Sequence, residues 1–496
     1  MSLNLFAHAS ARFNARGRID ARAGINTRAG RSTGSGARIN VRARATRINV
    51  RAALAVLLLL CVAAPPHAPA QQASSTMGVQ FMSGTPGTFA IRNARIVTVS
   101  GADVEGGTIV VSDGRITAVG ASVPVPPGAV EIDGRGLSVY PGMIDLGTSM
   151  GLIEIPQGAN ATVDVAEVGD MNPNAQAFYG INPHSAHVAV TRVNGVTSVL
   201  SSPSGGIISG QAAMINLLGS SPREMAVLPA AALVVNYPRA AGGGGFGGLF
   251  QQAQANPGEA TTARDRQVEQ LRKLLRDAEA YGRAMDAANA DRSLPRPDAD
   301  VVLASLVPYV RGERPVVFRA DREAEMRACI RFSEEMKLKP IILGGNDAWK
   351  MASFLKERNV PVILSGLFDL PSREDDYYDV MYESAAKLQQ AGVRFALSTG
   401  DQGAEVRDLP YRAGMAAAFG LSRADALKSV TLYPAQIMGV GDRLGSIEVG
   451  KIANLVVADG DLLEARTRIR HLFINGRQVP LNSRHTELYD QFKNRK

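Results

Sequence analysis

The sequence predicts an α/β protein, a (β/α)8 TIM-like barrel with a small composite β-sandwich domain formed by both ends of the mature chain. Short apolar segments alternate with amphipathic helical stretches through the middle of the chain. This alternation is the pattern of a parallel sheet covered by helices. A β-rich segment flanks this region on each side, and each is too small to bury a core alone. We therefore expect the two end segments to pack together as one domain.

A basic leader precedes the predicted domains. The 496-residue chain has a net charge of +8, but residues 1–70 contain eleven arginines and one acid, Asp20. The leader therefore carries +10, which leaves −2 for the remainder. The predicted folded body is close to neutral and gives no electrostatic indication of nucleic-acid binding.

The end of the leader is typical of a secretory signal peptide. A thirteen-residue apolar run at 52–64 follows the arginines, and Ala68-Pro69-Ala70 then forms a small-residue cleavage signal before Gln71. The run is shorter than the roughly twenty residues that a membrane-spanning helix needs. We expect a periplasmic or secreted protein without stable membrane insertion after cleavage; the alternative is an uncleaved anchor.

Local patterns support each predicted part in order. Asp113-Gly114 and Asn475-Gly476 stand at hairpin positions in the two β-rich segments. Apolar segments rich in β-branched residues are the predicted barrel strands: 195–203, 315–320, 339–345, 360–366 and 393–400. Amphipathic helices are predicted at 263–288, 322–337 and 348–358.

The predicted organisation follows from these segments. It is a signal peptide with a long basic n-region at 1–70, a linker at 71–85, the first part of the sandwich at 86–140, the barrel at 141–440 with a flexible Gly-rich insertion at about 241–262, the second part of the sandwich at 441–480 and a C-terminal tail at 481–496.

Ordered motifs at both ends of the barrel resemble the amidohydrolase superfamily, in its imidazolonepropionase- and prolidase-like branch. The resemblance runs from about residue 88 to residue 480. It implies the same barrel with a composite β-sandwich. The motifs are Tyr140-Pro-Gly-Met-Ile-Asp145, Gly420–Leu427, Thr431–Ala435, Asp442–Lys451 and Ala453–Val457.

The resemblance also implies a metal centre, because most members hold one or two divalent ions with histidines from several strands and a late aspartate. This sequence departs from that ligand pattern. Gly147 and Ser149 stand where a His-x-His pair is expected, and Arg319 and Gly344 replace later strand histidines. After cleavage four histidines remain, which are His184, His187, His471 and His485. We expect no metal cofactor, and specifically no ordinary binuclear zinc site.

A smaller site stays open. His184 and His187, on a helix that we expect to begin near Pro183, could hold a single zinc together with Asp401, or could bind substrate. The alternative is that the histidines only cap the helix and its loop. By the resemblance, Asp401 is the candidate catalytic residue, and His184 and His187 are candidate substrate-binding residues.

Arg319 is the other candidate substrate-binding residue. It ends an apolar strand, and a cation at a barrel mouth must be paired or must meet an anion. Its guanidinium could bind a substrate carboxylate with two parallel hydrogen bonds. Alternatively, it forms a structural salt bridge with Asp401 or Asp321.

Two functions remain open at this point. The resemblance implies an exported hydrolase of carbon–nitrogen bonds, with a degenerate, metal-poor site. The alternative is a non-catalytic relative, which binds a small anionic ligand or pairs with an active amidohydrolase paralogue. The partner predicted in either case is a small molecule, which carries a carboxylate if Arg319 binds it. The protein could also form a homo-oligomer, or a hetero-oligomer with an active paralogue.

Overall fold

The structure is a computed structural model that describes residues 83–155, 160–238, 257–400 and 403–495, with a short leader hairpin. The hairpin pairs β1 (His8–Phe13) with β2 (Ile19–Gly24) in antiparallel register. The chain divides into two compact units, at 1–74 and 75–496. The predicted apolar run, its cleavage site and most of the predicted insertion lie outside the described residues.

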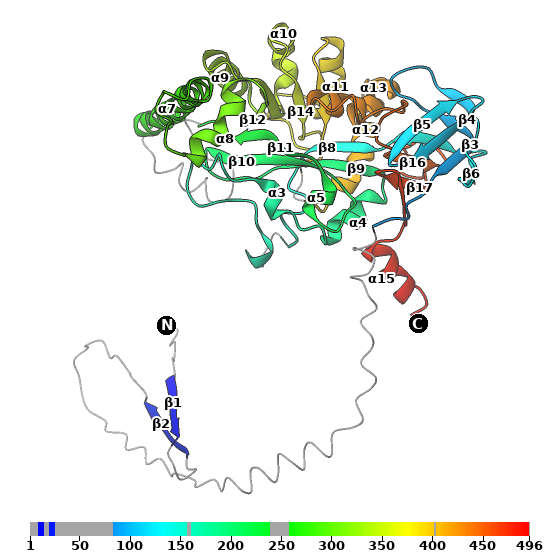
Figure 1. Cartoon of the computed structure of the whole chain (residues 1–496), viewed down its shortest axis with the longest axis horizontal. Helices are drawn as coiled ribbons and strands as arrows, with labels where there is room; N and C mark the ends of the chain where they lie inside the picture. Colours follow the sequence, from blue (N-terminus) through cyan, green and yellow to red (C-terminus); the bar gives the residue numbers. More distant parts are fainter. Residues whose placement is uncertain are drawn as a thin grey trace. The chain divides into compact units, whose positions relative to one another are not determined.

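The larger unit contains an eight-stranded barrel sheet (Figure 1). One cluster of buried apolar side chains takes residues from all eight strands, including Ile144, Leu200, Val317 and Ala396, and fills the barrel interior. The strands, in their order across the sheet, are β8 (Met143–Thr148), β9 (Val196–Ser201), β10 (Ile208–Asn216), β11 (Ala226–Val235), β12 (Val316–Ala320), β13 (Pro340–Gly344), β14 (Val362–Leu364) and β15 (Phe395–Leu397).

The barrel predicted from sequence is confirmed, with one strand reversed. β10 runs antiparallel to both β9 and β11, whereas the other neighbours in the sheet are parallel. Residues 202–207 alone join β9 to β10, and a parallel crossover needs a dozen residues or more. The short connection therefore forces a hairpin at this point, and the sheet is not built from eight identical β/α repeats.

Helices pack around the outside of this sheet (Figure 1). The predicted helix at 322–337 is confirmed to within two residues at each end, and that at 263–288 is the middle of a longer helix. The stretch at 348–358 begins as a 3-10 turn, η2 (Ala348–Met351). The principal helices are α7 (Pro257–Ala290), α8 (Val301–Val310), α9 (Glu323–Glu335), α10 (Ala352–Glu357), α11 (Val380–Gln390), α12 (Leu409–Ala418), α13 (Arg423–Ser429) and α14 (Leu432–Ile437).

A second sheet combines both ends of this unit. β16 pairs antiparallel with β7, and so joins the late strands to the early ones. The sheet encloses its own apolar core, in which the ring centroids of Phe89 and Phe473 are 5.1 Å apart. Its strands are β3 (Phe89–Ile96), β4 (Val104–Ser112), β5 (Arg115–Gly120), β6 (Val130–Asp133), β7 (Ser138–Pro141), β16 (Leu455–Ala458), β17 (Ile469–Ile474) and β18 (Arg477–Val479).

Buried amides connect the second sheet to the barrel. The Asn454 side chain donates to Asn216 Oδ1 at 2.9 Å and to Ser198 Oγ at 3.2 Å. Asn216 in turn donates to Asn475 Oδ1 at 2.6 Å, at the hairpin turn that the sequence predicted. The network fixes the two sheets to each other, because a buried polar group is costly unless it is hydrogen-bonded.

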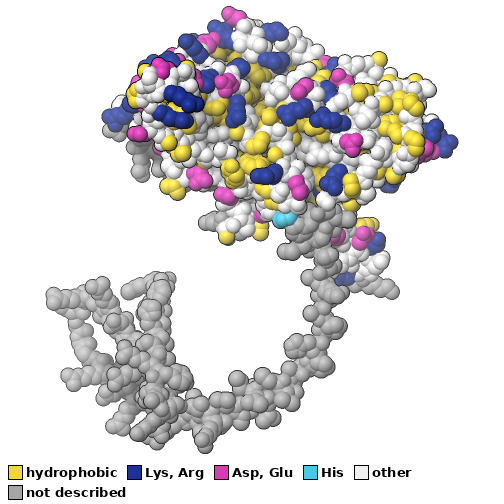
Figure 2. Space-filling view, in the orientation of Figure 1, with side chains coloured by type: hydrophobic (Ala, Val, Ile, Leu, Met, Phe, Trp, Pro, Cys, Tyr) yellow, Lys and Arg dark blue, Asp and Glu magenta, His cyan; other side chains and the backbone are white. Residues whose placement is uncertain are grey.

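The surface agrees with a near-neutral body. On the face shown in Figure 2, Lys and Arg side chains are interspersed with Asp and Glu. Within the described part of the chain, none of the helices has the length and apolar character needed to cross a membrane.

Candidate functional site

Asp145, in the middle of β8, contacts the residues that directly follow β15, and these two strands are the edges of the barrel sheet. This side chain is fully buried, and its two oxygens accept four hydrogen bonds. Oδ1 accepts from the Gly147 amide at 2.9 Å and from Ser398 Oγ at 2.5 Å. Oδ2 accepts from the Thr399 amide at 3.0 Å and from its hydroxyl at 2.6 Å.

Asp145 therefore holds the barrel edges together. In the described sheet no backbone ladder joins β8 to β15, so these side-chain bonds span the junction between them. With four donors already in place, the carboxylate is engaged in structure rather than free to accept a substrate proton. The role of Asp145 was not predicted, although a charged residue between Ile144 and Leu146 in an apolar strand indicates a buried side chain with partners.

At two positions where the resemblance predicted metal-ligating histidines, the structure leaves no room for a side chain. A Cβ added at Gly147 would meet Ser398 Oγ, and would lie 2.9 Å from Leu343 Cδ1. A Cβ added at Gly344 would meet Asp321 Oδ1, and the φ of Gly344 is +112°, which favours glycine. Neither position could hold a histidine without displacing these neighbours.

The described residues therefore do not fit the family's metal centre. Among the described residues, no group of three or more His, Cys, Asp or Glu side chains is arranged to hold a metal ion. Asp401, the candidate catalytic residue, lies outside the described residues, so its predicted pairing and ligand role stay predictions.

The two candidate histidines lie on either side of Ser185. The helix α4 (Ala186–Arg192) begins after Ser185, whose Oγ accepts from the His187 amide at 3.2 Å. The prediction that both histidines lie on this helix is wrong for His184, which lies in the preceding turn with its amide bonded to Asn182 Oδ1. Ser185, rather than Pro183, sets the helix start because its hydroxyl caps the first turn.

His187 makes a contact outside its own helix. Its Nε2 lies 3.0 Å from the Glu154 carbonyl oxygen. Its ring also lies against Gly403, two residues after Asp401, with the ring carbons 3.4 Å from where a Cβ of that glycine would be. The structure thus places His187 against Gly403, the first described residue after β15 and its following Ser398, Thr399 and Gly400.

Arg319 points into the barrel mouth. It lies two residues after Val317, which belongs to the interior cluster, whereas Phe318 and Ala320 face the outer core. Its Nη2 donates to the Pro203 carbonyl at a long 3.4 Å, and its buried Nε has no partner among the described residues.

The charge of Arg319 has no close acid in the part of the chain that the structure describes. No described carboxylate lies within ion-pair distance, so the predicted alternative of a salt bridge to Asp321 is not formed at close range. Burial lowers the pKa of the guanidinium, and the more distant charge of Asp321 opposes that shift only in part.

Four other polar side chains are either hydrogen-bonded or exposed. Ser149 Oγ donates to the Ser202 carbonyl at 3.2 Å, and Ser398 donates to Asp145. Neither serine hydrogen-bonds to a histidine among the described residues. Asp164 and Glu167 are exposed, as expected of a solvated loop.

Comparisons with known proteins agree with this architecture. The amidohydrolase family model matches residues 348–479. The amidohydrolase tasK of Hapsidospora irregularis is 27% identical over 399 residues, which cover 75% of this chain and 39% of tasK. N-acetylglucosamine-6-phosphate deacetylase of Haemophilus influenzae is 59% identical over 34 residues, 7% of this chain and 9% of the deacetylase.

Among solved structures, an amidohydrolase from Thermotoga maritima MSB8 superimposes with a TM-score of 0.70 and 25% sequence identity. The superposition covers 79% of this chain and 99% of the Thermotoga protein. The chain spans well under half the length of the two curated relatives, but nearly the whole of this structure. The family model, the tasK relative and the Thermotoga structure agree, and together they support the amidohydrolase superfamily for this chain.

Proposed function

We propose that this protein acts on a small amide-like molecule that carries a carboxylate, in the reaction class of its superfamily, the hydrolysis of a carbon–nitrogen bond. The observation that carries the proposal is Arg319. A guanidinium inside a barrel mouth, with one long hydrogen bond and no close acid among the described residues, is costly unless an anion completes it. A carboxylate matches its fork with two parallel bonds.

The proposed site departs from the family's metal chemistry. Gly147 and Gly344 leave no room for histidines, and Asp145 is fully hydrogen-bonded. The residues proposed to act on the substrate are therefore Arg319, as the carboxylate anchor, and His187 with Asp401, on adjoining segments.

The same observations favour a second candidate, binding without turnover. The two glycines and the engaged Asp145 remove three groups that could otherwise activate water. A protein of this kind would use Arg319 to hold a small anion, or would work beside an active paralogue.

One experiment separates the two candidates. Purified protein is incubated with N-acetyl amino acids and with their methyl amides, which lack the carboxylate, and both amine release and ligand-induced thermal shift are measured. Release from the acids alone, abolished in Arg319→Met, supports hydrolysis. A thermal shift without amine release supports the binding candidate. The absence of both signals would refute the proposal.

We also propose that the protein is exported after cleavage before Gln71. The support is the apolar run at 52–64, with its arginine flank and its small-residue site. The intact mass of the exported protein tests this, because a mass that retains residues 52–70 would contradict cleavage.

A further inference from the structure

A second charged cavity lies outside the barrel interior. Its volume is about 480 Å³, within the range of small-molecule sites. It lies beyond the carboxyl ends of β12 and β13, where barrel proteins build their sites. Six of its lining residues are charged: Arg322, Glu323, Arg327, Asp347, Lys350 and Arg373.

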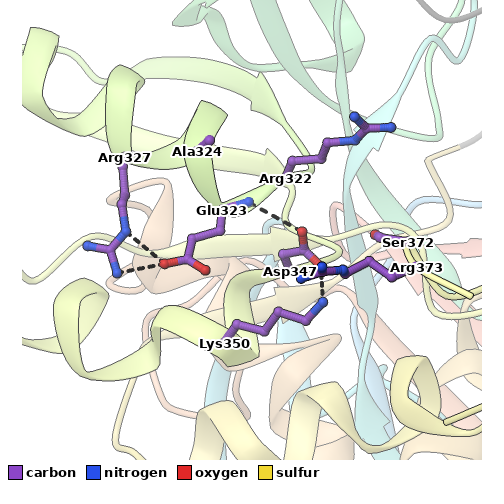
Figure 3. A pocket seen from close by; sticks show the side chains of 8 residues that line it. All are labelled: Arg322, Glu323, Ala324, Arg327, Asp347, Lys350, Ser372 and Arg373. Carbon is purple, nitrogen blue, oxygen red and sulfur yellow. Dashed lines mark hydrogen bonds and ion pairs between the residues drawn. The ribbon is translucent and has the colours of Figure 1, made fainter. Parts of the chain in front are cut away.

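Both acids of the cavity are already compensated. The Glu323 carboxylate accepts from Arg327 at 2.8 Å. The Asp347 carboxylate lies 3.0 Å from Lys350 Nζ and accepts from the Glu323 amide at 3.4 Å. Figure 3 shows Arg327 turned toward Glu323, and Lys350 below Asp347.

Two guanidinium groups remain for a ligand. Within the described chain, Arg322 has no side-chain hydrogen bond or ion pair, and no dashed line reaches it in Figure 3. Arg373 has one carboxylate, Asp375, at 3.4 Å from its Nε, and its side chain is 68% exposed. Asp376, close to Arg373 in sequence, pairs with Lys350, with its carboxylate 2.8 Å from Lys350 Nζ.

The cavity also lies at the start of the helix α9, whose first turn carries Glu323 and Glu325. Arg322 is the residue before the helix, and Glu323 and Ala324 of its first turn line the cavity. The amides of a helix N-terminus favour negative charge. The first of these amides already binds a carboxylate, that of Asp347.

We propose that this cavity binds the oxyanion group, phosphate or carboxylate, of a small organic molecule, with Arg322 and Arg373 as its two guanidinium ligands. Arginine suits the role because its planar donors match both groups. The cavity is larger than one oxyanion requires, so the ligand carries further atoms. This site is separate from that of the proposed function, because Arg319 points into the barrel whereas Arg322 begins the outer helix.

The test is binding of inorganic phosphate and of succinate to the full chain, measured by calorimetry at constant ionic strength. Arg322→Gln and Arg373→Gln should each weaken binding about tenfold, and the double variant further. The Arg322 side chain forms no hydrogen bond or ion pair with another described residue, so this variant should fold normally. Arg135→Gln is the matched control, because that exposed arginine pairs with Asp133 in the second sheet.

Each outcome decides the inference. Tighter phosphate than succinate binding, lost in the double variant, supports a phosphate-bearing ligand, and the reverse order supports a carboxylate-bearing one. Wild-type heat no larger than that of sodium chloride, or full binding by the double variant, overturns the site. Arg319→Met should leave phosphate binding within twofold, so a failure of the proposed function does not affect this test.

Discussion

Replacing Asp145 by asparagine tests whether this side chain closes the barrel. Each carboxylate oxygen accepts one backbone amide and one hydroxyl: Gly147 and Ser398 on Oδ1, and the two donors of Thr399 on Oδ2. Whichever oxygen becomes the NH2 group of asparagine, it faces one hydroxyl and one amide. The hydroxyl can rotate and accept, but the backbone N–H cannot.

The magnitude follows from that geometry. Asp145→Asn leaves one buried backbone amide without an acceptor, a cost of about 1–3 kcal/mol. It also converts the retained bonds from charge-assisted to neutral ones, which are roughly half as strong. We expect the free energy of unfolding to fall by about 2–4 kcal/mol.

The assay is urea denaturation of Asp145→Asn beside Asp133→Asn. Asp133 makes an exposed ion pair with Arg135, so its substitution should cost no more than about 1 kcal/mol. A second variant, Ser398→Ala, should couple with Asp145→Asn rather than add to it. Equal losses for the two asparagine variants would refute the idea that Asp145 joins the barrel edges.

Four further results are expected. Gly147→Ala should destabilise the protein by about 1–3 kcal/mol through overpacking. Gly101→Ala should be nearly neutral in the same denaturation assay, because the atom nearest to its added Cβ, Thr98 Oγ1, would be 3.7 Å away. Arg319→Met should leave the melting temperature of ligand-free protein nearly unchanged, and its effect should add to that of Asp401→Asn; strong coupling would instead reveal an ion pair. Burial lowers the pKa of His471 from its usual value of 6.5, so as the pH falls this side chain is protonated more readily in the unfolded protein than in the folded one. The free energy of unfolding that is lost between about pH 7.5 and 5.5 should therefore be smaller in His471→Gln. Elemental analysis of gently purified protein should find less than one zinc per chain, and a stoichiometric metal would contradict the steric argument.

Local patterns in the sequence were enough for most of the fold. The alternation of apolar segments and helices predicted the barrel, and the turns at 113–114 and 475–476 both occur, with positive φ at all four residues. The reversed strand β10 was missed because apolar content does not give direction. The length of the 202–207 connection carried that information, since it is too short for a crossover.

The site was less predictable, because its determinants are contacts between distant residues. Asp145 and its donor Ser398 are 253 residues apart. No periodicity shows that their side chains meet, or that this hydroxyl fills the space beside Gly147. The start of α4 depended on the Ser185 cap, a local signal that a proline two residues earlier obscured.

The closure of the barrel and the departure from the family's ligands have one physical cause. Ser398 Oγ donates to Asp145 and also occupies the space that a side chain at 147 would need. A histidine at 147 would therefore require a smaller residue at 398, and that change removes one donor from a buried carboxylate. Leu343 Cδ1, 2.9 Å from the same position, would still have to move. A histidine at 147 would thus weaken the contact that joins β8 to β15, so the hydrogen bonds at this barrel edge oppose a metal ligand at that position.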